Sequence, residues 1–399
     1  MKQGWEVKKL GDVCTFVRGP FGGSLKKNIF KEDGYAVYEQ QHAIYDQFDK
    51  IRYFIDENKF NEMKRFELNA GNLIMSCSGT MGKIAIVPND IKQGIINQAL
   101  LILNPSPKIS NIFLKLWMES KDFQDSLKKY SQGAAIQNVA SVKILKEIEI
   151  SLPPLPEQQR IVAILGEAFA AIAQAKANAE QNLKNAKELF ESYLQSVFEN
   201  KGEDWEEKLL SEICEVKDGT HDSPKYIAEG IPFVTQKNIR NDGLCFANTK
   251  FITDIDHNKF YKRSNVTFGD ILISMIGANR GMACIVDDKR VFSIKNVGLI
   301  KENERVNKYF LLHYLKSSLA MNYVLYMSNG GAQEFIGLTA LRSFPIPYPP
   351  LKEQQAIVKK LDALSTETKQ LEVIYQQKIN DLDELKKSIL QKAFVGELC

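Results

Sequence analysis

The residues of this chain that could carry chemistry do not form a catalytic motif. The segment around Lys83 resembles a phosphate-binding loop, but that motif requires glycine at the position of Cys77 and Ser or Thr at the position of Ile84. No G-x-G-x-x-G sequence follows a predicted strand, and no cluster of acidic residues and lysines stands out. Four histidines lack the spacing of a zinc site: His42, His221, His257 and His313. We therefore predict a protein that is not an enzyme by itself and has no metal or cofactor of its own.

Several loops instead combine glycine with amide or basic side chains. Glycine lets the backbone approach a phosphate closely, and amide and guanidinium groups can hydrogen-bond the edges of nucleic-acid bases. In the first half of the chain, the candidates for such contacts are Arg18, Lys26, Lys27, Gln40, Gln41, Thr80, Lys83, Gln137 and Asn138. In the second half, they are Lys217, Thr220, His221, Lys225, Gln236, Lys237, Asn279, Arg280 and Gln333. An ordinary solvated loop is the alternative interpretation for each residue.

The chain contains the same sequence pattern twice. PPLPEQQRIVAIL at 153–165 returns as PPLKEQQAIVKKL at 349–361, and WEVKKLGDVC at 5–14 returns as WEEKLLSEIC at 205–214. The repeat unit is close to half of the chain, which indicates a duplicated domain and not a solenoid. Gln40 and Gln236 occupy equivalent places, as do Gln137 and Gln333, so these four are candidates for module structure or phosphate positioning. Nonmatching positions, such as Arg18 against Lys217 or Lys83 against Gly281, are better candidates for a difference in specificity between the two halves.

Each PPLxEQ segment is predicted to begin a long helix. The prolines end a strand-like run at 146–152, and no proline and only Gly166 occur from there to Asn200. Apolar residues then recur in steps of four and three in both copies, which is typical of a coiled-coil seam. The positions expected in this seam include Ile161, Leu165, Ile172, Leu189, Ile357, Leu361, Leu364, Leu371, Leu382 and Leu385.

Roughly 40 helical residues form a rod of about 60 Å, which cannot bury its apolar stripe alone. The simplest partner is the duplicate helix. The same heptad register places Asn182 and Lys378 at equivalent seam positions. A buried polar residue there would fix register, whereas Lys378 could equally extend along the seam with its charge in water.

Composition indicates a soluble globular protein. The chain has 399 residues, is 44% hydrophobic and carries a net charge of +3 from 52 basic and 49 acidic residues. It has no apolar run of the roughly 18 residues that a membrane span requires, so no membrane contact is expected. Six cysteines without a C-x-x-C pair suit buried side chains in a reducing cytoplasm. The weak net charge alone does not indicate nucleic-acid binding.

The two variable modules, the two PPLxEQ helices and the final LQKAFVGEL together resemble the specificity subunit of a type I restriction-modification system. The resemblance covers essentially the whole chain, and its motifs are specific because they recur at matching places. It implies an α+β protein with two mixed target recognition domains and two long helices that form an antiparallel coiled coil, related by a pseudo-two-fold axis. Sequence alone does not choose between parallel and antiparallel helices.

The resemblance also implies partners. Each recognition domain would read one half of an interrupted, asymmetric site in double-stranded DNA. Two modification subunits would dock on the helices and supply S-adenosylmethionine and adenine methylation. Restriction subunits would add translocation and cleavage that use ATP and Mg²⁺.

The expected domains are target recognition domains at 1–152 and 201–348, a central helix at 153–200 and a C-terminal helix at 349–399. In each recognition domain we expect strands, at 71–76 and 269–274 among others, followed by paired amphipathic helices at 111–129 and 307–325. Two alternatives stay open: a recognition subunit of another multi-subunit restriction system, and a coiled-coil scaffold that binds proteins.

Overall fold

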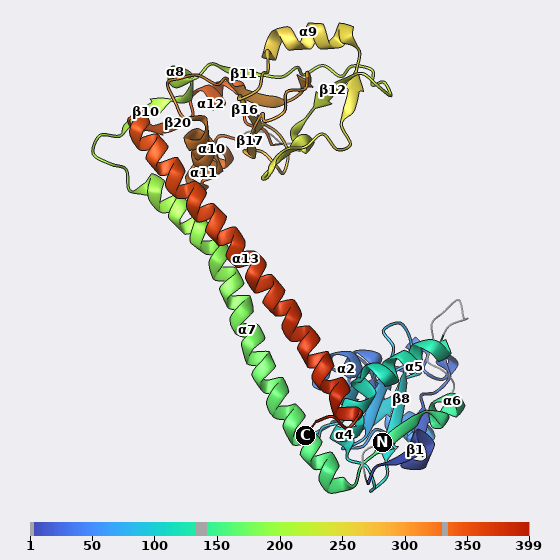
Figure 1. Ribbon diagram of the computed structural model, residues 1–399. Helices are drawn as coiled ribbons and strands as arrows, with labels where there is room; N and C mark the ends of the chain where they lie inside the picture. Colours follow the sequence, from blue (N-terminus) through green and yellow to red (C-terminus); the bar gives the residue numbers. More distant parts are fainter. Residues whose placement is uncertain (1–3, 132–141, 329–333, 399) are drawn as a thin grey trace. The chain divides into compact units, whose positions relative to one another are not determined.

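The structure is a computed structural model that describes residues 4–131, 142–328 and 334–398. It consists of two compact units, one formed by Met1–Ala179 with Gln377–Cys399 and the other by Glu180–Gln376. We call these unit 1 and unit 2. The parts of the chain outside the two long helices are called module 1 (4–154) and module 2 (200–350). Each unit therefore contains one module and a part of both long helices (Figure 1).

Module 1 is built on a four-stranded antiparallel sheet and a three-stranded mixed sheet. The first has the order β2 (Cys14–Arg18), β8 (Leu100–Pro105), β5 (Leu73–Ser76), β6 (Ile84–Ile86). The second has the order β4 (Phe54–Ile55), β3 (Tyr35–Tyr38), β7 (Gly94–Ile96), with β3 and β7 parallel. A separate pair joins β1 (Glu6–Lys9) to β9 (Glu149–Leu152).

Short helices complete module 1. They are α1 (Leu10–Val13), η1 (Gly22–Ser24), η2 (Lys27–Ile29), α2 (Gln40–Tyr45), α3 (Glu57–Glu62), η3 (Lys64–Phe66), α4 (Asn111–Glu119), α5 (Lys121–Ser131) and α6 (Val142–Glu147). The predicted strand at 71–76 and the predicted helix pair from Asn111 are confirmed.

Module 2 repeats this plan. Its antiparallel sheet has the order β11 (Val216–Asp218), β19 (Val297–Ile300), β16 (Ile271–Ser274), β17 (Ala283–Ile285). Its mixed sheet has the order β15 (Lys250–Ile252), β12 (Ile231–Val234), β18 (Ser293–Ile294), with β12 and β18 parallel. The pair β10 (Glu206–Leu209) and β20 (Pro345–Tyr348) matches β1 and β9, and the hairpin β13 (Ile239–Arg240) and β14 (Gly243–Leu244) is added.

As in module 1, helices complete the fold of module 2. They are α8 (Leu210–Ile213), η4 (Gln236–Asn238), α9 (Asp254–Ser264), α10 (Lys308–Lys316), α11 (Ser318–Met327) and α12 (Leu338–Arg342). Here too the predicted helix pair, α10 and α11, is confirmed.

The central strands are continuously apolar because both faces of the four-stranded sheet are covered. In β5, Leu73 and Met75 belong to one core and Ile74 to another, and all three are fully buried. In β16, Ile271 and Leu272 divide in the same way. Successive strand residues point to opposite faces, so a sheet covered on both sides needs an apolar residue at every position.

The repeated PPLxEQ motif has a structural explanation in its glutamine. Gln158 is fully buried; its Oε1 accepts from the backbone N of Ser110 at 2.8 Å, and its Nε2 donates to the carbonyl of Pro153 at 2.8 Å. Gln354 makes the same pair of bonds, to Asn307 N and Pro349 O, both at 2.8 Å. Each glutamine thus ties the start of a long helix to the start of α4 or α10.

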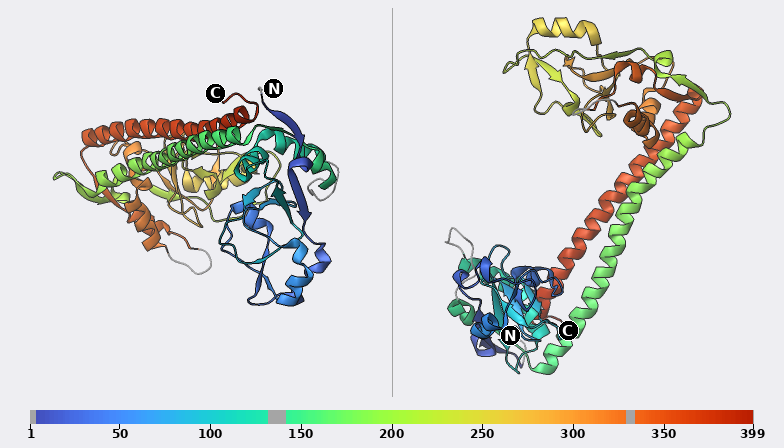
Figure 2. Two further views of the ribbon diagram at one scale, coloured as in Figure 1. Left: turned by 90° about the horizontal axis from the view of Figure 1, so that it is seen from below. Right: turned by 180° about the vertical axis from the view of Figure 1, so that it is seen from behind.

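The long helices are α7 (Leu155–Glu199) and α13 (Leu351–Phe394), and they run side by side in opposite directions within each unit (Figures 1 and 2). In unit 1, Ile161 near the start of α7 shares a core with Phe394 at the end of α13. In unit 2, Phe198 near the end of α7 shares a core with Leu361 near the start of α13. The predicted antiparallel coiled coil is confirmed.

The predicted seam register is wrong in its later turns. Ile161, Leu165, Ile172 and Leu361 are buried as expected, Ile357, Leu364 and Leu382 are partly buried, but Leu189, Leu371 and Leu385 are 49%, 37% and 45% exposed. Asn182 and Lys378 are exposed as well, so neither is a buried polar seam residue. A straight helix has 3.6 residues per turn, so a strict seven-residue repeat drifts by about 20° per heptad around its surface. Over several heptads this drift moves the buried stripe on by one residue. Buried Ile379 shows this shift.

This corrected register predicts different effects for two leucines of α13 in unit 2. Leu361→Asp should destabilise unit 2 by several kcal/mol, because Leu361 is fully buried and an unpaired charge would lose its hydration. Leu371→Asp should change the unfolding free energy by about 0.5 kcal/mol or less, since its side chain reaches solvent. Chemical denaturation followed by circular dichroism measures both, and equal losses would contradict the register.

By length and composition, one described helix could also cross a bilayer. This is α7, whose most apolar 18-residue window has a mean hydropathy of 1.2. Ile161 and Leu165 lie in the core of unit 1, and Leu194 and Phe198 lie in the core of unit 2. Of the apolar window itself 17% is buried, so packing within the two units covers only part of the apolar side of α7.

Candidate nucleic-acid interface

In module 1, three loops with sequence-predicted residues lie at one edge of the sheets. The Oγ of Ser78 donates to the Oε1 of Gln40 at 3.4 Å, which joins the β5–β6 loop to the start of α2. Gly19, next to Arg18, packs so closely on the β7–β8 turn that a Cβ would lie 1.9 Å from the Asn97 carbonyl oxygen. Only glycine fits there, so the loop after β2 is held against this turn.

The other predicted residues of module 1 are exposed or line separate cavities. Lys26 and Lys27 are exposed in or beside η2, and Thr80 is exposed in the β5–β6 loop. Lys83 lines a cavity of about 480 Å³ that includes Lys386 of α13. Gln41 lines a smaller one of about 290 Å³. The candidates of module 1 therefore do not converge on one pocket.

Phe21 was not predicted from sequence, although at 93% it is the most exposed large apolar side chain among the residues of module 1 that the structure describes. It follows buried Pro20 and precedes η1 in the loop that begins with Arg18. Its exposure was not apparent because the sequence pattern drew attention to the glycines and lysines around it.

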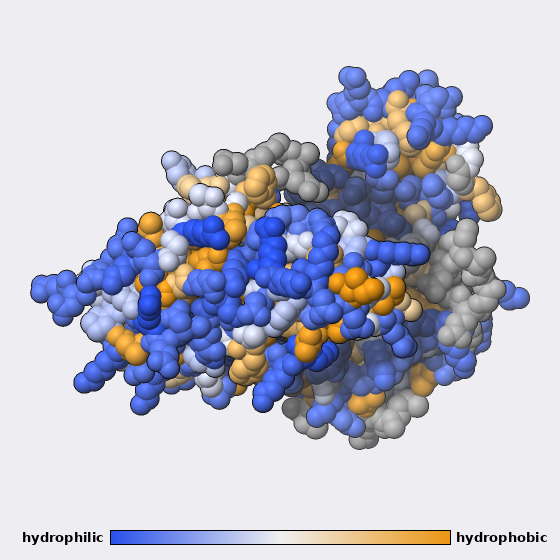
Figure 3. Space-filling model, turned by 90° about the horizontal axis from the view of Figure 1, so that it is seen from above, coloured by the Kyte–Doolittle hydropathy of each residue, from blue (hydrophilic) through white to orange (hydrophobic). Residues whose placement is uncertain are grey.

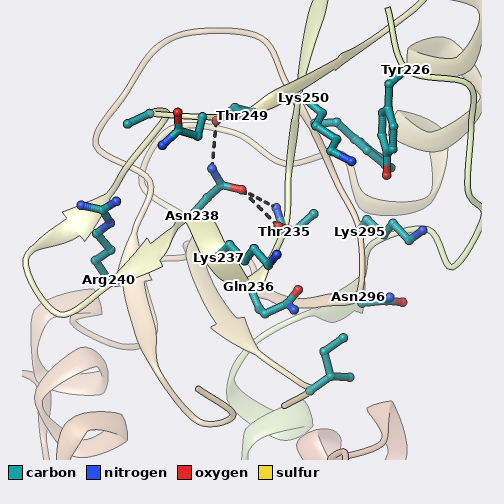
Figure 4. Close-up of a pocket in the computed structure, with 14 residues that line it drawn as sticks. Tyr226, Thr235, Gln236, Lys237, Asn238, Arg240, Thr249, Lys250, Lys295 and Asn296 are labelled. Atoms are coloured by element: carbon teal, nitrogen blue, oxygen red, sulfur yellow. Dashed lines mark hydrogen bonds between the residues drawn. The ribbon is translucent and has the colours of Figure 1, made fainter. Parts of the chain in front are cut away.

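Module 2 brings two predicted residues to one cavity of about 510 Å³ (Figure 4). Gln236 and Lys237 line it, together with residues that the sequence analysis missed: Arg240, Lys250 and Lys295. These missed cations come from β13, β15 and the segment after β18. Their convergence depends on the pairing of β12 with both β15 and β18, which sequence does not display.

Asn238 fixes the wall of this cavity. Its Oδ1 accepts from the backbone N of Thr235 at 2.8 Å, and its Nδ2 donates to Cys245 O and Thr249 Oγ1, both at 2.9 Å (Figure 4). His42 has the matching position in module 1, where its Nδ1 lies 2.9 Å from Glu39 N. Both buried residues close the turn that carries the equivalent glutamines Gln236 and Gln40, so these turns are rigid in the same place.

The loop after β11 is held by hydrogen bonds that involve β11, α9 and the segment after β18. The His221 ring lies 2.7 Å from Asn296 Oδ1 and 3.1 Å from Asp218 Oδ2. Asp218 also accepts two bonds from Arg263, at 2.8 and 2.7 Å. Thr220 is buried, and its Oγ1 accepts from Asp222 N. These partners give the loop a defined conformation.

The remaining candidates of module 2 differ in their freedom to contact a ligand. Lys217 forms an ion pair with Glu215 at 3.1 Å. Arg280, which the sequence suggested as a base contact, is mostly buried and pairs with Glu334. Asn279 and Lys225 are exposed. Gln137, Asn138 and Gln333 lie outside the described residues.

The chemistry of the described residues suits binding more than catalysis. Within 4–131, 142–328 and 334–398, no group of three or more His, Cys, Asp or Glu side chains could hold a metal ion. Burial raises the pKa of Cys77 to about 12, with a smaller opposing effect from Arg18, so this thiol is not a nucleophile at neutral pH. On the face drawn in Figure 3, hydrophilic residues predominate and hydrophobic ones occur in small groups. This face suits a polar partner.

The sequence matches a family model described as the type I restriction modification DNA specificity domain, at residues 2–184 and again at 202–381. The chain belongs to this family. The two matches coincide with the duplication and together span most of the chain.

Curated relatives agree over nearly full length. The chain is 25% identical to the putative type I restriction enzyme MjaX specificity subunit of Methanocaldococcus jannaschii, with 99% of this chain and 93% of the relative covered. It is 21% identical to the EcoKI specificity subunit of Escherichia coli, with 100% and 90% covered.

Solved structures share the fold. The HsdS subunit from Thermoanaerobacter tengcongensis superposes with a TM-score of 0.69 at 20% identity, covering 100% of this chain and 98% of that one. A chain from a structure of type I restriction-modification complex assembly and conformational transition gives 0.74 at 20% identity, with 100% and 99% covered. The family assignment predicted from the repeated motifs is confirmed.

Proposed function

We propose that this chain is the DNA-recognition subunit of a type I restriction-modification complex and that each module reads one half of a bipartite, asymmetric site. The observation that carries this proposal is the duplication within a DNA specificity family. Two family domains occur in one chain, and each has its own rim of polar loops. Because the loops differ between the modules, the two half-sites should differ as well.

The helix pair supports the assembly with partner subunits. Several apolar side chains of α7 and α13 remain exposed beside the seam, among them Val373 at 70% and Ile374 at 57%. We propose that two modification subunits bind the helices and supply S-adenosylmethionine for adenine methylation. Restriction subunits that use ATP and Mg²⁺ complete the complex. Catalysis then belongs to these subunits, and this chain acts as a noncatalytic adaptor to the DNA.

We also propose that the protein works in the cytoplasm, where its DNA substrate would be. The five cysteines that the structure describes in detail are all free thiols: Cys14, Cys77, Cys214, Cys245 and Cys284. Four of them are buried, which suits a reducing compartment.

The proposal predicts weak DNA binding by the subunit alone. Its net charge of +3 supplies few of the phosphate contacts that dominate affinity, so tight specific binding should require the modification subunits. Titrating a duplex with the methylated motif against the subunit and against the reconstituted complex tests this, with a scrambled duplex as control. The motif comes from methylome sequencing of cells with and without this gene. Equal affinities at physiological salt would contradict the prediction, and an unchanged methylome would overturn the proposed function.

A further inference from the structure

The cavity of module 2 gathers four cationic side chains from four elements. Lys237 lies in η4, Arg240 ends β13, Lys250 begins β15 and Lys295 follows β18 (Figure 4). None of the residues that line the cavity is an aspartate or glutamate. The other lining residues are amides, hydroxyls and apolar groups.

Within the described part of the chain, the four cations of the cavity have no carboxylate partner, unlike several other basic residues of the same unit. Elsewhere in unit 2, Lys301 pairs with Asp270 at 2.6 Å and Lys308 with Glu302 at 2.6 Å. Among the residues described, the four cations of the cavity form no ion pair. A cavity lined by cations and by no carboxylate has a positive potential, which favours an anionic ligand there.

Two of the four cations are already held in place. The Lys295 Nζ donates to the Oγ of Ser223 at 2.6 Å, and the Lys250 Nζ lies 4.2 Å from the centre of the Tyr226 ring. Lys295 is also half-buried as a residue, so part of its side chain packs against the module. Preorganised donors lose less conformational entropy when they bind a ligand.

Module 1 lacks the three lysines of this cavity at the equivalent backbone positions. The backbone N of Lys295 donates to Val234 O at 2.9 Å beyond the parallel pair β12–β18, and Asn97 N donates to Tyr38 O at 2.8 Å beyond β3–β7. Asn97 therefore matches Lys295. Gln41, which follows the shared glutamine Gln40, matches Lys237.

The third equivalence comes from the strand register. Ile55 pairs with Tyr35, and Ile252 pairs with Ile231, so Tyr53 occupies the place of Lys250 two residues earlier. Tyr53 stacks on Phe30 with ring centroids 4.4 Å apart. One scaffold thus carries an aromatic stack in module 1 and a cationic cavity in module 2.

We propose that the cavity of module 2 binds phosphate groups of the DNA backbone and has no counterpart at the equivalent place in module 1. This inference rests on the proposed DNA-recognition function. The cavity would position the second half-site without reading its bases, because lysines contact phosphate as point charges and phosphates carry no sequence information. Base discrimination then falls to neighbouring side chains.

The test uses the full complex with its modification subunits and the methylated duplex. Lys237→Gln and Lys295→Asn each install the residue of module 1. Each lost phosphate contact should make the slope of log affinity against log salt concentration shallower by about 0.9, and the double variant by about 1.8. The methylated motif should stay the same. Lys262→Gln removes an exposed lysine of α9 outside the cavity and should leave the slope unchanged.

Several results would overturn the inference. One is an unchanged salt slope in the double variant while specific binding is retained, and another is an altered motif, which would mean that these lysines read bases. To distinguish DNA phosphates from a free phosphate compound as the ligand, inorganic phosphate and AMP are titrated into the complex without DNA in a calorimeter. The cavity would be assigned to a free phosphate compound if the wild-type complex bound phosphate or AMP, the double variant did not, and the salt dependence of DNA binding stayed unchanged. A wild-type complex that binds no specific duplex would instead overturn the proposed function itself.

Discussion

A fragment that ends at Asn200 is expected to form a two-fold symmetric dimer and to direct methylation to an interrupted palindrome. The fragment keeps module 1 and α7 but loses α13, whose Leu390 and Phe394 belong to the core of unit 1. Leu194 and Phe198 occupy the matching places in α7. A second copy of the fragment can therefore supply the missing residues, and an isologous pair has true two-fold symmetry.

Two measurements test this expectation. Light scattering gives the oligomeric state of the fragment, and methylome sequencing of cells that also express the modification subunit gives the motif. Phe198→Ala within the fragment serves as control, because it removes the replacement for Phe394 and should prevent dimerisation. A monomeric wild-type fragment, or an asymmetric motif from a confirmed dimer, would contradict the two-fold argument.

The duplicated architecture could be predicted because its sequence evidence is local. Two PPLxEQ segments mark both helix starts, and runs such as 73–75 are apolar at every position because their strands are covered on both faces. The role of Gln158 and Gln354 could not be predicted. Their partners, Ser110 and Asn307, are close only in the folded chain.

The seam register was missed because a strict heptad repeat and the true helical period agree over two or three turns and separate afterwards. Leu189 and Lys378 were assigned one position too early for this reason, as exposed Lys378 beside buried Ile379 shows. Apolar residues on both sides of the seam made the two registers hard to distinguish by sequence.

The cavity of module 2 was missed for a different reason. Lys250 begins β15 and Lys295 follows β18, and no glycine-rich loop marks either position. Only the pairing of both strands with β12 brings the two lysines together. For Arg280, the glycine-rich loop predicted a DNA contact, and the structure adds an ion pair with Glu334 that sequence did not indicate. Loop composition indicates exposure, but ion pairing is decided by tertiary structure.

Replacing the phenylalanines at the two helix ends should destabilise one unit each. Phe198 is 1% exposed, and its ring centroid lies 5.1 Å from that of Tyr314 and 5.5 Å from that of Phe310. Phe394 is 7% exposed and packs edge-on against Phe113 at 5.2 Å. Truncating such a residue to alanine leaves a cavity and costs about 3–5 kcal/mol.

Phe198→Ala should therefore weaken unit 2, and Phe394→Ala should weaken unit 1, although the two residues occupy equivalent places in the repeat. Because two cores need not unfold together, a single melting temperature does not describe the loss, and hydrogen exchange or limited proteolysis must locate it. Val373→Ala, on an exposed side chain of α13, is the control and should stay within about 0.5 kcal/mol. If Phe394→Ala raised exchange in module 2 as much as in module 1, the helix ends would not belong to separate cores, and the division of the chain into two units would be wrong.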